Sequence, residues 1–405
     1  MTTPITAPAV DLRPRSALPV LFNYGFRPFF LLAGLSAPLL VVVWLLVLAG
    51  RVAMDGAVSP LAWHAHEMLF GFAAAAVAGF LLTAVPSWTG TAALSGRPLA
   101  ALVALWLAGR VASLPAFAGS AAAAAVDLAF LPALGLALAL PLVRAGKWRN
   151  IAFLALLALM TVGNLLIRLE WLGLPGGDAA AGTALVTGVV LMMVAVIGGR
   201  ILPAFTRNAL KARGDTTVVA APGPVDAAAL ALTAAVVVGD VLAPAATAAG
   251  WLALAAALAH GVRLARWRGD RTLRDPLLWS LHAGYAWIVA ALGLKAAWLL
   301  GDAAGAAAWL HALTAGGFAT MILAVMSRAA LGHTGRPLVA PRATAAAFGV
   351  LTAAAVIRVA APALPGIEYT HALAAAGLLW TLAFALFVAD YAPILLRPRA
   401  DGRPG

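Results

Sequence analysis

Residues 63–86 read WHAHEMLFGFAAAAVAGFLLTAVP, an apolar run that contains a single Asp, Glu, Lys or Arg residue, Glu67. The hydrocarbon core of a bilayer requires about 20 apolar residues in a helix. Because lipid offers no hydrogen bonds to backbone polar groups, such a run must be helical inside a membrane. The stretch therefore predicts a transmembrane helix that carries two histidines and a glutamate near its beginning.

The same apolar pattern continues along the chain. Of the 405 residues, 63% are hydrophobic and 10% are charged, and the mean hydropathy is +0.98. Soluble domains are close to half apolar and a quarter charged, so a water-soluble fold is excluded. We predict an all-α membrane protein, a polytopic bundle of about twelve transmembrane helices. The predicted spans are about 27–49, 63–86, 99–115, 120–142, 150–172, 180–202, 225–243, 246–266, 276–300, 305–328, 343–361 and 369–395.

The formal charge of +12 comes from basic residues in alternate connections between the predicted spans. This distribution differs from the stripe or tail typical of nucleic-acid binding. The positive-inside rule then predicts that both termini lie in the cytoplasm. The first 20 residues lack the apolar core of a signal peptide, so we do not expect them to be cleaved. The basic clusters are Arg144, Lys147 and Arg149; Arg207, Lys211 and Arg213; and Arg263, Arg266, Arg268, Arg271 and Arg274.

The linker between the sixth and seventh predicted spans divides the chain into two halves. We predict a cytoplasmic N-terminal tail (1–26), a first six-helix half (27–210), a cytoplasmic linker (211–224), a second six-helix half (225–396) and a cytoplasmic C-terminal tail (397–405).

Seven histidines are the most informative polar residues, because ionisable groups inside spans are costly and point to a function or a partner. The chain has no cysteine, which excludes disulfides, iron–sulfur clusters, thiolate copper sites and c-type haem attachment. Four histidines share a depth near the predicted outer side, and we predict that they have a common metal or haem role: His64, His66, His311 and His371. His282 and His333, toward the inner side, are the second choice as metal ligands. His260, beside Arg263, is predicted to have a structural role.

The spacing of His64 and His66 limits what they can bind together. Residues two apart on a regular helix point about 200° away from each other, so the pair cannot chelate one metal. His64, Glu67 and Met68 are predicted to share one face and His66 to face elsewhere, which suits two sites or one ligand with a supporting partner. A haem takes one or two axial imidazoles and a copper ion two or three. For any single histidine, a hydrogen bond at a helix end explains the position equally well.

Other polar residues have simpler structural explanations. Asn164 is predicted to hydrogen-bond across helices. Asp240 and Lys295, near outer helix ends, are predicted to be solvated.

Several long motifs resemble the NnrS family of bacterial membrane proteins, and the resemblance covers nearly the whole chain. The motifs are NYGFRPFF (23–30), WHAHEMLFG (63–71), GFLLTAVPSWTG (79–90), LWLAGR (105–110), GGRILPAFTRN (198–208) and MSRAALGHTGR (326–336). The resemblance implies a twelve-span protein of the bacterial inner (cytoplasmic) membrane that carries haem and copper. It also implies a role in nitric oxide metabolism, denitrification and resistance to nitrosative stress. The implied partners are the lipid bilayer and nitric oxide or a related small molecule, with no nucleic acid.

On this resemblance we expect haem b held by histidine pairs, with copper bound by the remaining outer histidines. Arg27, Arg110 and Arg200 could pair with the haem propionates, because guanidinium binds carboxylates bidentately; contact with lipid headgroups explains these arginines equally well. Whether nitric oxide is bound, reduced, oxidised or sensed stays open, and with it enzyme status. The alternative is a secondary transporter whose buried His, Glu and Arg side chains couple protons or substrate. A third interpretation is an assembly partner without a cofactor.

Overall fold

The structure is a computed structural model that describes residues 19–54, 56, 58–301, 305–363 and 366–403. Within these residues the regular secondary structure is helical and no strand occurs, which confirms the predicted all-α fold. Most of the predicted N-terminal tail, residues 1–18, lies outside the described residues.

Eleven helices of the described chain are long and apolar enough to cross a membrane. The third predicted span, 99–115, is not among them. It corresponds to α4 (Gly96–Ala112), which has 17 residues and packs against α6. The eleven are α1 (Phe26–Leu48), Pro60–Thr89 (α2, η2 and α3), α6 (Ala121–Arg144), α7 (Trp148–Trp171), α8 (Ala179–Ala212), α9 (Pro224–Leu242), α10 (Thr247–Ala265), α11 (Pro276–Gly301), Ala306–His333 (α12, η4 and α13), Arg342–Ala363 (α14 and η5) and α15 (Tyr369–Leu396). The shorter elements are η1 (Val20–Asn23), α5 (Pro115–Ala118) and η3 (Gly269–Thr272).

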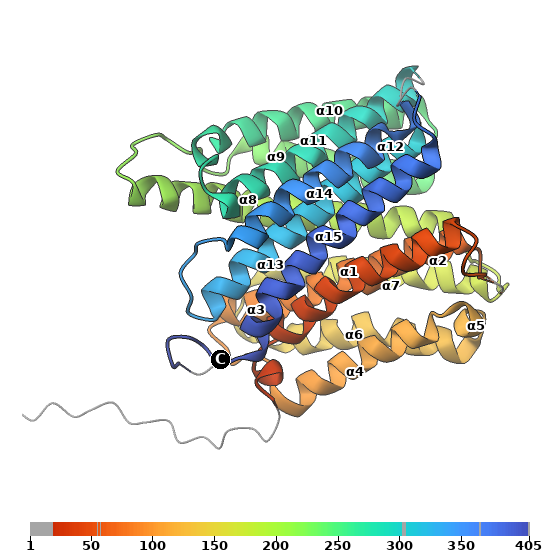
Figure 1. Cartoon of the computed structure of the whole chain (residues 1–405), viewed down its shortest axis with the longest axis horizontal. Helices are drawn as coiled ribbons and strands as arrows, with labels where there is room; N and C mark the ends of the chain where they lie inside the picture. The colour runs from red at the N-terminus through yellow and green to blue at the C-terminus, as the bar shows by residue number, and fades with distance from the viewer. Residues whose placement is uncertain (1–18, 55, 57, 302–304, 364–365, 404–405) are drawn as a thin grey trace, which may run out of the picture.

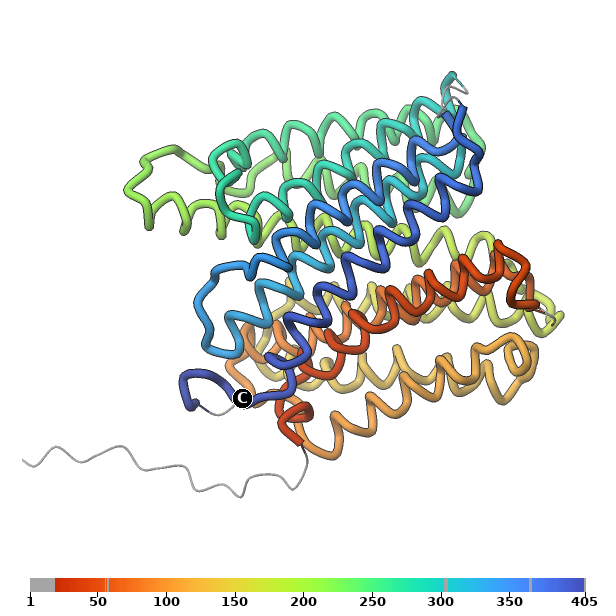
Figure 2. Tube along the Cα trace, viewed as in Figure 1, coloured from red at the N-terminus to blue at the C-terminus, as the bar shows by residue number. Residues whose placement is uncertain are grey.

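The long helices run side by side in one bundle (Figure 1). The pair α4 and α6 lies at one edge and the group α9, α10 and α11 at the opposite edge, while α1, α3, α13 and α15 lie between them. α1 packs against both α3 and α15, so the first and last long helices of the chain are neighbours. Figure 2 shows the C-terminal end of the trace close to the beginning of α1.

Local sequence signals explain where several helices begin and how closely they pack. Ser59 caps α2 by accepting a hydrogen bond from the Ala62 amide, and Pro60 occupies the first turn. The cap gives one free amide of the helix start a partner, and proline has no amide hydrogen that would need one. Gly188 of α8 faces α9. A Cβ atom there would lie 2.7 Å from Cγ2 of Val237, so the missing side chain permits this close helix contact.

Two features of the helices differ from the sequence prediction. α8 continues to Ala212, past the predicted end at residue 202, because its exposed Arg207 and Lys211 remain compatible with a helix outside the apolar layer. Two spans also contain a seven-residue π-helical segment, η2 (Glu67–Ala73) and η4 (Ala312–Phe318). η2 directly follows His66 and η4 directly follows His311. π turns occur frequently at functional sites.

Candidate functional site

Two of the predicted histidines, His64 and His311, lie in the same region of the structure. His64 lies in α2 (Pro60–His66) and His311 ends α12 (Ala306–His311), both at the end of the bundle away from the C-terminus (Figure 1). His64, His311 and Arg358 of α14 lie within electrostatic range of one another. We refer to these three residues as the outer cluster.

Several side-chain nitrogens of the outer cluster have no hydrogen-bond partner among the described residues. Nδ1 of His311 donates to the carbonyl oxygen of Ala307 at 2.8 Å, which leaves the Nε2 lone pair available. Nδ1 of His64 is buried and has no hydrogen-bond partner among the described residues, and its ring stacks on Trp44 at 4.5 Å between centroids. One nitrogen of the Arg358 guanidinium is also buried without a hydrogen-bond partner. Buried polar atoms of native proteins are nearly always paired, so each exception calls for an explanation such as an absent ligand.

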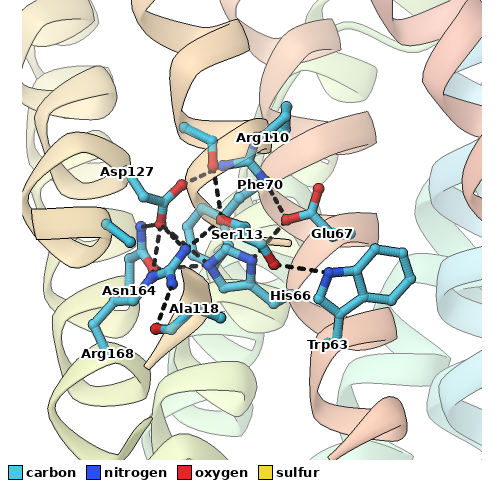
Figure 3. Close-up of polar contacts among 12 residues, drawn as sticks. Trp63, His66, Glu67, Phe70, Arg110, Ser113, Ala118, Asp127, Asn164 and Arg168 are labelled. Carbon is cyan, nitrogen blue, oxygen red and sulfur yellow. Dashed lines mark hydrogen bonds and ion pairs between the residues drawn. The ribbon is translucent and has the colours of Figure 1, made fainter. Parts of the chain in front are cut away.

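His66 faces a different part of the bundle and belongs to a buried ionic network (Figure 3). Its Nδ1 lies 3.0 Å from Oε1 of Glu67, and its Nε2 lies 3.2 Å from Oδ2 of Asp127 and 3.1 Å from Oδ1 of Asn164. Both ring nitrogens therefore have oxygen partners, in contrast to those of His64.

Two arginines complete this network. Arg110 of α4 pairs with Glu67 at 2.6 Å and also with Asp127. Arg168 of α7 pairs with Asp127 at 2.9 Å and contacts the hydroxyl of Ser113. The side chains of Asp127, Arg168 and His66 are 0% exposed. Two carboxylates thus balance two guanidiniums, which is how buried charges are tolerated.

The network connects four helical segments and fixes the beginning of the second span. It joins the α2–η2 junction to α4, α6 and α7, and Nε1 of Trp63 adds a hydrogen bond to the Ser113 carbonyl at 2.9 Å. Because His64 lies between Trp63 and His66 in one helix, these contacts also set the orientation of His64.

The prediction that Glu67 shares a face with His64 is wrong. The carboxylate of Glu67 contacts His66 and Arg110 instead, because its flexible side chain reaches sideways toward α4. The predicted hydrogen bond of Asn164 across helices is confirmed by its contacts with His66 and Asp127.

Asp127, which pairs with both arginines, was missed by the sequence interpretation. The available signal was a carboxylate inside an otherwise apolar run of α6, since Asp127 is the one Asp, Glu, Lys or Arg residue between Ala121 and Val143. A charged residue in that position needs a partner inside the bundle.

The other predicted histidine ligands occupy separate places. His371 has a side chain that is 78% exposed and lies 3.7 Å from Glu368 at the beginning of α15. His282 is buried, with Nε2 2.9 Å from the Thr206 hydroxyl, and His333 packs its ring beside Tyr24. In the part of the chain that the structure describes, no three His, Cys, Asp or Glu side chains are grouped as a metal site.

The three arginines predicted to pair with propionates also have distinct surroundings. Arg27 is buried and donates to the carbonyl oxygens of Leu395 and Arg397 at 2.8 Å, at the end of α15. Arg110 is part of the ionic network. Arg200 is exposed and donates to Asn150 at 2.7 Å.

The second half of the chain contains its own buried polar cluster. Arg263 donates to Asp226 at 2.7 Å and to the Tyr285 hydroxyl at 2.7 Å. His260 lies 2.7 Å from Tyr285 and 2.8 Å from Thr233, which confirms the predicted structural role for His260. The prediction that Lys295 and Asp240 are solvated is wrong, because the two side chains pair between α9 and α11 and Lys295 is only 3% exposed.

A family model described as NnrS protein matches residues 20–399. No curated protein matches the chain.

Proposed function

The chain belongs to the NnrS family, and on that premise we propose that it is a haem protein of the bacterial inner membrane that acts in nitric oxide metabolism or resistance to nitrosative stress. The outer cluster is the proposed haem site, with His64 and His311 as ligands. We include copper in the proposal because the family resemblance points to it.

The observation that carries the proposal is the incomplete pairing of these two imidazoles. They come from spans that are more than two hundred residues apart in the chain, yet they lie within electrostatic range. The hydrogen bond from His311 Nδ1 to a backbone carbonyl is the arrangement that typically fixes the tautomer of a ligating histidine. His64 has no hydrogen bond that competes for its buried Nδ1.

The residues around the pair fit a haem. The buried, unpaired nitrogen of Arg358 is suited to a propionate, because charge-assisted hydrogen bonds between guanidinium and carboxylate are strong. Haem iron would supply a redox-active centre when bound. The ionic network around His66 contributes by holding the helix that carries His64.

The proposal is tested on the purified full-length protein. We expect a Soret band, a pyridine haemochrome spectrum of haem b, and iron in stoichiometric amount, with copper measured in the same sample. A colourless, iron-free protein from cells supplied with haem precursors would contradict the proposal. If that colourless protein moved protons or solutes in liposomes, the transporter interpretation would replace it.

We also propose that both termini face the cytoplasm, supported by the basic connections. Arg399 donates to the His333 carbonyl, so the C-terminal segment lies at the same end of the bundle as the basic loop after α13. A C-terminal fusion to green fluorescent protein is expected to fluoresce, and alkaline phosphatase inserted between Leu174 and Asp178 is expected to be active. Active phosphatase at the C-terminus with an inactive one in the 174–178 loop would reverse the orientation.

A further inference from the structure

A cavity of about 300 Å³ lies at the inner end of the bundle, away from the outer cluster. Its walls come from α1, α3, α8, α13 and the segment after α13, and three phenylalanines line it: Phe30, Phe80 and Phe205. This volume is at the lower end of the range of small-molecule sites, about 300–1,000 Å³, which are typically apolar with a few polar groups. We refer to it as the inner cavity.

Two nitrogen-bearing side chains of the inner cavity make no hydrogen bond with the described residues, although Asp275 acts on Arg328 electrostatically at longer range. The guanidinium of Arg328 lies over the ring of Phe205, 4.2 Å from its centroid, and makes no hydrogen bond or ion pair with the described residues. The ring nitrogens of His333 likewise make no hydrogen bond within that part of the chain, while the ring packs against Tyr24 and Phe26. Both residues line the cavity. A half-buried guanidinium has a strong requirement for an acceptor oxygen.

A second, smaller cavity continues from the first. It has a volume of about 60 Å³, shares Phe30, Phe80 and Val325 with the inner cavity, and is lined only by apolar side chains. Three of these are methionines, Met193, Met321 and Met326, whose flexible side chains adapt to different apolar shapes. Together the two cavities offer hydrogen-bond donors from Arg328 and His333, aromatic walls from phenylalanines, and an apolar extension.

We propose that the inner cavity binds a membrane quinone. A quinone ring is planar and suits a cavity lined by phenyl rings, and its carbonyl oxygens would accept hydrogen bonds from Arg328 and His333. The first carbons of its hydrocarbon chain would enter the apolar extension, and the rest of the chain would lie in the lipid. A phospholipid phosphate could also pair with Arg328, but the three phenylalanines of the lining favour a planar neutral ring over a strongly hydrated phosphate. The proposal concerns binding and does not depend on the haem assignment.

The test uses the full-length protein in nanodiscs of zwitterionic lipid, with decyl-ubiquinone as the probe and equilibrium dialysis as the measurement. We expect saturable binding, weakened about tenfold by Arg328→Gln, since that change removes a charge-assisted donor contributing about 1.4 kcal/mol. Ala84→Leu, which narrows the same cavity without a change of charge, is expected to weaken binding as well. Arg207→Gln, at an exposed arginine on α8, is the matched control and should bind like the native protein.

Three results would overturn the proposal. They are absence of saturable binding, equal binding by the native protein and both cavity variants, and complete displacement of the probe when phosphatidylglycerol is added to the nanodisc. The last result would identify an anionic lipid as the occupant. The Soret spectrum of Arg328→Gln is expected to equal that of the native protein, so failure of the quinone proposal and failure of the haem proposal are distinguishable.

Discussion

Replacing His311 with alanine is expected to remove the haem absorption of the purified protein, and replacing His64 should have the same effect. Each change deletes an imidazole of the outer cluster that has a ring nitrogen available for a metal. Loss of a group that merely orients a ligand already lowers metal affinity by about 10–100-fold, so loss of the ligand should reduce bound haem by at least that factor. The measurement is haem per chain from the Soret band and the haemochrome assay.

His371→Ala is the matched control, because His371 is largely exposed and its removal should leave the spectrum unchanged. Misfolding is separated from ligand loss with His311→Gly, for which added imidazole is expected to restore part of the absorption. His66→Ala tests the remaining predicted ligand in the same span. Native spectra in both His64→Ala and His311→Ala would remove these residues from the ligand set.

Asp127→Asn is expected to cause the largest loss of stability of any single isosteric change in the protein. Asp127 accepts contacts from Arg110, Arg168 and Asn164 and has a side chain that is 0% exposed. The amide would leave two buried guanidiniums with Glu67 as their one remaining carboxylate. Removing one partner of a buried ion pair costs about 3–5 kcal/mol, and the expected observable is a large fall in the unfolding midpoint in detergent.

Asp270→Asn provides the control for this change. Asp270 pairs with Arg268 and Arg271, but its side chain is 57% exposed, and solvated ion pairs contribute little to stability. The double variant Asp127→Asn with Arg168→Met is a second test. It removes the buried guanidinium that Asp127→Asn leaves without its carboxylate, so it should be more stable than Asp127→Asn alone. If Asp127→Asn and Asp270→Asn shifted the midpoint equally, the network would have no special role in stability.

In the second span, the directions of the two histidines could be predicted from the sequence, but the partner of Glu67 could not. The opposite directions of His64 and His66 follow from helix geometry alone, and the contacts of the two rings with Trp44 and with Asp127 confirm them. The partners of Glu67 were predicted wrongly, because its long side chain reaches Arg110 of α4 and the residue pattern does not show which helix lies beside it.

The ion pairs between spans could not be predicted from the sequence either. Asp127 and Arg168 lie 41 residues apart in the chain, and Lys295 pairs with Asp240 over 55 residues. Each residue alone indicates that a buried charge needs a partner. The identity of that partner depends on which helices are neighbours and how each is rotated.

The residue pattern alone shows that the chain forms many apolar membrane-spanning helices, that it belongs to its family, and that its basic residues gather at alternate connections. These properties follow from the length and polarity of consecutive residues, because the bilayer acts on each span separately. Helix packing is what places His64 within electrostatic range of His311 and Arg358, brings His66 into an ionic network and puts Arg328 beside a cavity. Those contacts depend on helix rotation and packing, which arise from small residues and shape complementarity between distant segments.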